Sequence, residues 1–201
     1  MGREKHVEQS KKLSWLLRHG AMEAGVQMDA AGWVAIEDVL RFLGASRADL
    51  DEAVRLNTKS RLQVEGARIR ACQGHSTERM PVTLEALEAS WSEVEGDASI
   101  WHGTRVDVLP AIAREGIVPQ ARTHVHLTAG LDSKVGKRAQ VDVMLEVSPA
   151  RLRAEGLCVF QSPNGVVLVR KVPPGCIVGV QAIAEKARQR EASLRALFSA
   201  V

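Results

Sequence analysis

The chain has 201 residues, 45% of them hydrophobic, which is enough for one large domain or two small ones with a real core. Its formal net charge is only +3, so bulk electrostatics do not indicate a nucleic-acid-binding protein, and any polyanion would have to be bound by local clusters of arginine. No run approaches the roughly 18 apolar residues that a membrane-spanning helix needs, so we expect no membrane association.

Cysteine usage and the N-terminal residues favour an intracellular location. Cys72, Cys158 and Cys176 are far apart and no pair has C-x-x-C spacing, which argues against a disulfide framework and against a zinc site. The N-terminal stretch MGREKHVEQSKK contains no apolar segment of the kind found in a secretory signal. We therefore expect a cytoplasmic protein in a reducing compartment.

The first predicted element is a short amphipathic helix within residues 10–21, SKKLSWLLRHGA. Leu13, Leu16 and Leu17 recur at helical spacing and would bury one face of the helix. Gly20 is positioned to end the helix, because glycine commonly follows the last helical turn.

Arg18 and His19 stand side by side in the last turn of that helix. Positive side chains are favourable at the C-terminal end of a helix, where the helix dipole is negative, so structure alone can explain the pair. The alternative is an anion-binding pair, which requires further arginines from other parts of the chain. These two residues by themselves leave both explanations open.

The next segments predict a compact N-terminal module. MDAAGWVAIEDVLRFLGA indicates a turn at Gly32, a short strand and a helix, and SRADLDEAVRLN indicates a helix that Ser46 caps together with Asp49. RLQVEGARIRACQ alternates on either side of Gly66, which favours a hairpin. Three helices, a short strand and a hairpin are typical of a winged-helix module, which binds nucleic acid in some proteins and other proteins elsewhere.

The second half has a different pattern. TLEALEASWSEVEG predicts one acidic helix, and after it IWHGT, HVHLT, VDVMLEV, GVVLVRKV and CIVGV are rich in β-forming residues. VLPAIAREGIVP, LDSKVGKRAQ and SPARLRAEG predict short helices, and AIAEKARQREASLRALFSA predicts a final helix. We therefore predict an α+β protein divided into residues 1–80, a linker helix over 81–99, and residues 100–201.

Arg68 and Arg70 are candidate anion-binding residues in RIRACQGHS, because they share one face of the predicted strand. The alternative is a hairpin that merely exposes its arginines to solvent. His102, Gly103 and Thr104 lie at the end of the strand IWHGT, where a glycine lets a ligand approach the backbone closely and two side chains can form hydrogen bonds. A tight turn with an internally bonded histidine explains these three residues equally well.

Arg122, His124, His126 and Thr128 fall on one face of the predicted strand in ARTHVHLT. Two histidines in H-x-H spacing without a nearby carboxylate or cysteine pair are a poor metal signature, so we predict no metal site. Arg138 follows a glycine in SKVGKRAQV, and a charge in such a position is usually solvated. None of these motifs is decisive alone.

The order of the motifs along the chain is more specific than any one of them. In sequence order the blocks are LSWLLRHG, MDAAGWVAIEDVL, IRACQGHS, WHGT, EGIVPQARTHVHLT, VGKR, NGVVL and VPPGCI. In this order they resemble the RNA 2'-phosphotransferases, often called tRNA 2'-phosphotransferases, over nearly the whole chain, from about Lys11 to Val180.

The resemblance implies a winged-helix RNA-binding lobe followed by a lobe like that of the NAD-using ADP-ribosyltransferases. It implies an enzyme that removes an internal RNA 2'-phosphate, as left by tRNA splicing or handled in RNA repair, and consumes NAD as a co-substrate. The 2'-phosphate first becomes ADP-ribosylated as nicotinamide leaves. A second step then releases RNA with a 2'-OH and ADP-ribose 1'',2''-cyclic phosphate.

The resemblance also implies the site residues. The family's catalytic set falls on Arg18, His19, Arg70 and Arg138, and its dinucleotide-contacting H-G-T falls on His102, Gly103 and Thr104. The strand written H-V-H-L-S in the family is HVHLT here, which adds His126 and Thr128 as cofactor-binding candidates. Cys72 stands where asparagine is common and Gly20 where other residues are frequent, and neither change removes a charged catalytic group.

The implied chemistry suits these residue types. Arginines hold phosphate oxygens in a bidentate fork and stay charged, and His19 can give a proton to the departing 2'-oxygen of the RNA. No metal is required. We expect a monomer whose partners are NAD and RNA with an internal 2'-phosphate. Two alternatives stay open: ADP-ribosylation of terminal phosphates on RNA or DNA, and a winged-helix regulator with an NAD-sensing lobe.

Overall fold

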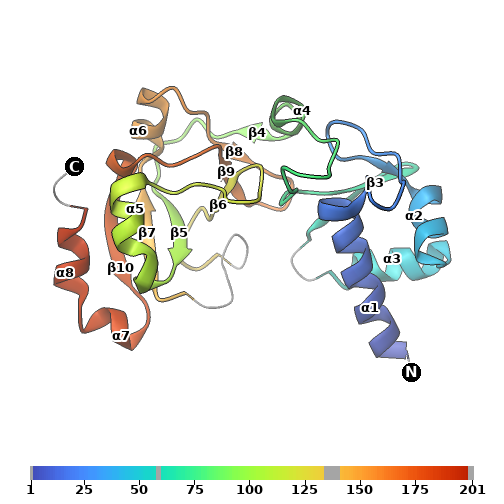
Figure 1. Cartoon of the computed structure of the whole chain (residues 1–201), viewed down its shortest axis with the longest axis horizontal. Helices are drawn as coiled ribbons and strands as arrows, with labels where there is room; N and C mark the ends of the chain where they lie inside the picture. Colours follow the sequence, from blue (N-terminus) through green and yellow to red (C-terminus); the bar gives the residue numbers. More distant parts are fainter. Residues whose placement is uncertain (1, 58–59, 134–140, 199–201) are drawn as a thin grey trace. The chain divides into compact units, whose positions relative to one another are not determined.

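The computed structural model describes residues 2–57, 60–133 and 141–198 (Figure 1). Helices and short strands occur throughout these ranges, so the predicted α+β class is confirmed. No helix within them is both long and apolar enough to cross a bilayer.

The described residues divide into two compact units. The first unit contains the chain up to Trp91 and, in addition, the short segment Ala121–Thr123. The second unit contains Ser92–Gln120 and the chain from His124 onward. The two units are described separately below.

The first unit combines helices with a small antiparallel sheet of strand order β1-β3-β2. The three helices, the short strand and the hairpin predicted for this part of the chain are all present. Ser46 caps α3 in a capping box with Asp49, and Gly66 forms the hairpin turn with a φ of 58°, a conformation that glycine adopts without strain. The elements are α1 (Gly2–Trp15), a π-helical turn (Leu16–Gly20), β1 (Val34–Ala35), α2 (Ile36–Leu43), α3 (Arg47–Arg55), β2 (Leu62–Glu65), β3 (Arg68–Ala71) and α4 (Leu84–Glu88).

The apolar stripe of the first helix anchors it to the unit. Leu13, Leu16 and Leu17 are fully buried, and they belong to one hydrophobic cluster with Val39 of α2 and Ile69 of β3. Burial of each large aliphatic side chain contributes roughly 1.5–3 kcal/mol. The leucine spacing therefore fixes which face of α1 and of the following π-helical turn lies against the core.

Gly20 does not end the helix in the way we predicted. The chain leaves α1 through a π-helical turn, and Ala21 after it still has helical dihedrals. A Cβ added at Gly20 would overlap the indole ring of Trp15. Gly20 is therefore needed for close packing beneath the Trp15 ring rather than for a left-handed helix end.

The predicted linker helix over residues 81–99 is wrong for most of its length. Only Leu84–Glu88 is helical, capped by Thr83, and the chain then turns and forms β4 (Ser92–Glu93). Tertiary contacts hold this turn, because the Trp91 indole N–H donates to the Cys72 carbonyl at 3.0 Å. A helix continued through this residue could not make that contact.

The second unit contains two antiparallel sheets, of order β10-β7-β5 and β4-β8-β9-β6. They are joined where Trp101 and Thr128 exchange two backbone hydrogen bonds of 2.9 Å. The further elements are β5 (Ile100–Thr104), α5 (Leu109–Glu115), β6 (Val125–Leu127), β7 (Val143–Val147), α6 (Pro149–Ala154), β8 (Phe160–Gln161), β9 (Val167–Val169), β10 (Ile177–Ala182), α7 (Glu185–Arg188) and α8 (Glu191–Ala196).

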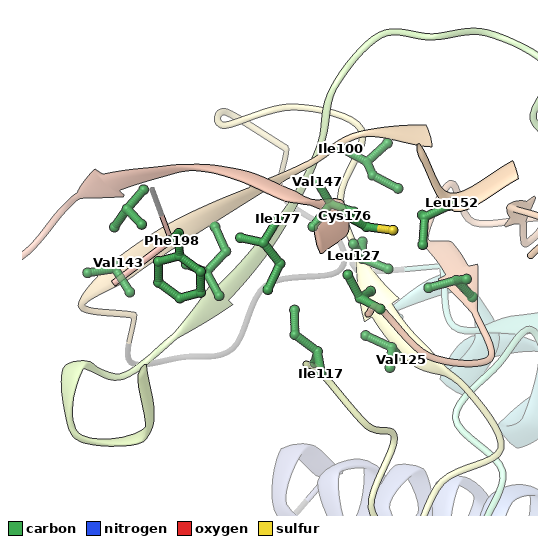
Figure 2. Packing of buried hydrophobic residues seen from close by; sticks show 14 of the residues in the cluster. Ile100, Ile117, Val125, Leu127, Val143, Val147, Leu152, Cys176, Ile177 and Phe198 are labelled. Atoms are coloured by element: carbon green, nitrogen blue, oxygen red, sulfur yellow. The ribbon is translucent and has the colours of Figure 1, made fainter. Parts of the chain in front are cut away.

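The core of the second unit is formed by alternating residues of these strands. Val143 and Val147 of β7 pack with Leu127 of β6 and Ile177 of β10, and Phe198 from the C-terminal segment joins them (Figure 2). All five residues are buried. Strand alternation thus places apolar side chains on one face of each sheet, as the period of two requires.

Two predictions for the second half have different outcomes. The single C-terminal helix is instead the two short helices α7 and α8, separated at Arg190, whose φ of −121° is not helical. The helical piece predicted within residues 131–140, which carries Arg138, lies mostly outside the described residues.

Candidate active site

Arg18 is a half-buried cation, and two of its side-chain nitrogen atoms are fully enclosed. Its Nε and Nη2 atoms are buried and have no hydrogen-bond partner among the described residues. Burial first, and then the positive charges of Arg61 and Arg122, lower the pKa of Arg18 to about 10. Since an unpaired charge that is partly removed from water is costly, an anion that approached Arg18 would be bound favourably.

The π-helical turn positions Arg18 and His19 next to the core. Leu16 and Leu17 are fully buried, so the backbone that carries the two polar residues after them has little freedom to move. Single π-helical turns of this kind often occur at functional sites. The alternative explanation, a solvated helix end, does not fit an arginine whose nitrogen atoms are buried.

His19 is fixed in orientation by Ser76. Its Nδ1 lies 2.7 Å from the Ser76 Oγ, and the Ser76 backbone N–H donates to the Arg18 carbonyl at 2.9 Å. Ser76 therefore ties together both residues of the pair. Burial first, and then the charges of Arg18 and Arg122, lower the pKa of His19 below its ordinary value.

Arg70 is held by protein acceptors instead. It is 3% exposed, with Nε donating to the Gln63 Oε1 at 2.8 Å and Nη1 donating to the Ser90 Oγ at 2.7 Å and the Ala31 carbonyl at 3.3 Å. Its guanidinium carbon also lies 4.5 Å from the centre of the Trp33 ring. Burial lowers the pKa of Arg70. The alternative of a solvent-exposed hairpin arginine therefore does not apply to Arg70.

Arg68 and Cys72 complete this part of the site. Arg68 is the exposed arginine of the hairpin and forms an ion pair with Glu65 at 2.9 Å. Its guanidinium carbon lies 4.4 Å from the centre of the Trp33 ring. Burial raises the pKa of the Cys72 thiol to about 11, although the charges of Arg70 and Arg18 act against the rise. Both arginines therefore lie close to Cys72.

The structure thus brings part of the predicted catalytic set together. Arg18 and His19 are adjacent, Arg70 lies near Cys72 in the same unit, and Arg138 lies outside the described residues. The sequence-based reasoning missed Ser76 as the partner of His19. Ser76 stood in the block IRACQGHS, but nothing local to that block indicates a bond to a histidine 57 positions away.

The predicted dinucleotide-binding residues gather at the junction of the two sheets of the second unit. The His102 Nδ1 lies 3.0 Å from the His126 carbonyl, and because a carbonyl can only accept, Nδ1 carries the proton. In the neutral ring Nε2 is then the acceptor nitrogen. The Thr128 Oγ donates to the Gly130 carbonyl at 2.9 Å. A Cβ added to Gly103 would lie only 2.9 Å from a methyl group of Val141, so this glycine also serves packing.

Thr104 and His124 are both buried, Thr104 at the end of β5 and His124 just before β6. Among the described residues no group of three or more histidine, cysteine, aspartate or glutamate side chains could hold a metal ion.

Comparison with known proteins identifies the class. The family model "RNA 2'-phosphotransferase, Tpt1 / KptA family" matches residues 4–171. Similar proteins named "Probable RNA 2'-phosphotransferase" are found in Rhizobium johnstonii (35% identical over 174 residues, 83% of this chain and 90% of the relative) and Pseudomonas syringae pv. tomato (36% over 182 residues, 86% and 94%). Another, from Streptomyces griseus subsp. griseus, is 36% identical over 190 residues, covering 87% and 96%.

These matches define a transferase. The chain belongs to the RNA 2'-phosphotransferase family, and the resemblance predicted from the eight sequence blocks is confirmed.

Proposed function

We propose that the protein removes an internal 2'-phosphate from RNA with consumption of NAD, through an ADP-ribosylated 2'-phosphate. The products are RNA with a 2'-OH, ADP-ribose 1'',2''-cyclic phosphate and nicotinamide. The observation that carries the proposal is the guanidinium of Arg18 beside His19, with two buried nitrogen atoms that have no partner among the described residues, in a chain that belongs to this family.

The phosphate is the natural occupant of the Arg18 site. A phosphate monoester carries close to two negative charges at neutral pH and has three acceptor oxygens. A phosphate that binds at Arg18 offsets the charge of the guanidinium, whose Nε and Nη2 atoms have no hydrogen-bond partner among the described residues. On the family resemblance, Arg70 and Arg138 are the further cations of this set.

His19 is proposed to deliver the proton in the second step. The lowered pKa keeps His19 neutral in the free protein near neutral pH. A bound dianionic phosphate acts in the opposite direction to Arg18 and Arg122 and raises the pKa, so His19 gains a proton when substrate is present. The protonated ring can then donate to the departing 2'-oxygen, while Ser76 keeps the Nδ1 side of the ring in place.

The second unit is proposed to bind NAD in the manner of an ADP-ribosyltransferase lobe. His102, with its proton fixed on Nδ1, offers Nε2 as an acceptor for a ribose hydroxyl. His126 and Thr128 lie on the neighbouring strand segment, tied to β5 by the Trp101–Thr128 hydrogen bonds. NAD supplies the ribose carbon and the hydroxyl that take up the phosphate. The first unit, with its helices and the β2–β3 hairpin, is proposed as the winged-helix RNA-binding lobe.

The direct test is incubation with NAD and a short RNA that carries one internal 2'-phosphate. We expect release of nicotinamide and of ADP-ribose 1'',2''-cyclic phosphate, with conversion of the RNA to the 2'-OH form. A stable ADP-ribosyl adduct on a terminal phosphate would instead support the alternative reaction. If the folded protein consumed no NAD with any phosphorylated RNA, the proposal would be contradicted.

A further inference from the structure

The segment Ala121–Thr123 belongs to the first unit although the residues on either side of it in the chain belong to the second. It runs antiparallel to residues 75–77. The Thr77 N–H donates to the Ala121 carbonyl at 3.2 Å, and the Thr123 N–H donates to the His75 carbonyl at 3.1 Å. These backbone bonds set Arg122 directly opposite Ser76.

Ser76 is the residue that holds the candidate site together. Its backbone N–H bonds the Arg18 carbonyl and its hydroxyl bonds His19. The register of the segment therefore places Arg122 beside both. The charge of Arg122 contributes to the lowered pKa of Arg18 and to that of His19, whereas Arg61 contributes only to that of Arg18. Arg122 is thus the exposed cation that faces the Arg18–His19 pair as a whole.

A third cation in this place adds to the positive charge around Arg18 and His19. The backbone bonds that attach the segment are made by Ala121 and Thr123, so they do not themselves require an arginine at position 122. The charge of Arg122 adds like-charge repulsion to the Arg18 guanidinium, whose Nε and Nη2 atoms are buried without a hydrogen-bond partner in the described part of the chain. A bound anion removes this penalty, because it interacts favourably with every cation around it.

We propose that Arg122 is a substrate-binding residue, which contacts the phosphate of the RNA at the Arg18–His19 site. The inference rests on the proposed function. Arg18, which is half-buried, would hold the inner side of the phosphate, and Arg122, which is exposed, would contact its outer side once the RNA has entered. The guanidinium fork allows two hydrogen bonds to one phosphate group, which a lysine in the same place could not reproduce.

The test measures binding without NAD, so that no turnover occurs. Two short RNAs of the same sequence are used, one with an internal 2'-phosphate and one with a 2'-OH. The proteins are the full-length wild type, Arg122→Ala, Arg122→Lys and, as a control, Arg41→Ala, which removes an arginine of the same unit whose side chain is 76% exposed. Thermal unfolding of each variant checks that the backbone attachment survives.

We expect Arg122→Ala to bind the 2'-phosphorylated RNA about ten- to a hundredfold more weakly, the usual effect of losing a charge-assisted hydrogen bond, and the 2'-OH RNA almost unchanged. Arg122→Lys should recover part of the loss, and Arg41→Ala should show none. Equal losses for both RNAs, or a loss no larger than that of Arg41→Ala, would overturn the proposal.

A second measurement separates this inference from the proposed function. In Arg122→Ala without RNA, the pKa of His19 followed by NMR should rise toward its ordinary value, because one of its three causes has been removed. An unchanged pKa would show that Arg122 does not face the site, whatever the substrate. If the pKa rises but the wild type does not distinguish the two RNAs, the proposed function fails instead.

Discussion

The π-helical turn and strand β3 each carry one arginine that is at least partly buried, and the two arginines differ in what surrounds them. Arg70 on β3 gives its N–H groups to Gln63, Ser90 and Ala31, and it stacks on Trp33. Arg18 on the π-helical turn has two buried nitrogen atoms with no partner in the described part of the chain.

The difference separates a residue whose contacts stabilise the fold from one whose charge, on our proposal, is offset by the substrate. The contacts of Arg70 offset the cost of its burial, so its removal leaves acceptors unpaired. The burial of Arg18 is not offset within the described chain, so stability is sacrificed at that position. We therefore expect substitutions of the two arginines to act alike on catalysis and in opposite directions on stability.

The largest expected effect is on turnover. Arg18→Ala should slow conversion of a 2'-phosphorylated RNA by about a hundredfold or more, because a charged contact to the reacting phosphate is lost. Single-turnover assays with saturating NAD measure it. Arg41→Ala is the matched control and should react like the wild type, since its side chain is paired with Asp38 on the surface of α2. Wild-type rates for Arg18→Ala would contradict the assignment of the site.

The next effect is on the free energy of unfolding. Arg18→Met should stabilise the free protein by about 1–3 kcal/mol, the usual cost of a buried unpaired polar group. Arg70→Met should destabilise it by about 2–4 kcal/mol, because Gln63 and Ser90 lose their partner. Urea denaturation measures both. Two changes of the same sign would show that the surroundings of the two arginines do not differ as described.

A smaller effect is expected from the packing that shapes the π-helical turn. A methyl group at Gly20 would overlap the Trp15 ring, so Gly20→Ala should cost about 1–3 kcal/mol and displace the indole. Gly96→Ala is the control, because a Cβ there meets nothing within 4 Å. The difference in tryptophan fluorescence between the variant and the wild type reports the displacement of the indole, and urea denaturation reports the loss of stability. If Gly20→Ala behaved like Gly96→Ala, close packing at Gly20 would not be what shapes the turn.

Local sequence patterns were enough to predict the elements that local forces determine. The spacing of Leu13, Leu16 and Leu17 predicted the buried face of the first helix, and Ser46 with Asp49 predicted a capping box that the structure contains. The α+β class followed from the same kind of pattern.

Features that depend on distant residues could not be predicted in this way. The π-helical turn depends on the Trp15 ring over Gly20, and the interruption of the acidic helix depends on the bond from Trp91 to Cys72. The pairing of Arg122 with Ser76 joins strand segments about 45 positions apart and leaves no local signature. The cationic site was therefore only partly visible in the sequence: its residues could be named, but not their neighbours.

The smallest expected effect concerns pH and again depends on the cations around Arg18. The pKa of His19 is lowered in the folded protein, by burial first and then by Arg18 and Arg122, so the unfolded chain binds the His19 proton more readily. The contribution of His19 to stability is therefore fully present above pH 6.5, its ordinary pKa, and is lost as the pH falls from 6.5 toward the lowered value.

Replacing His19 by glutamine removes this dependence while keeping a hydrogen-bonding side chain next to Ser76. The free energy of unfolding should therefore fall less between pH 7.5 and 5.5 in His19→Gln than in the wild type. The buried histidines His75 and His124 are present in both proteins, so they do not affect the difference between the two. In Arg18→Met the wild-type dependence should be reduced but not abolished, since burial and Arg122 remain. An identical fall in the wild type and in His19→Gln would mean that His19 keeps its ordinary pKa, and the cations would then lie too far from its ring to control the proton.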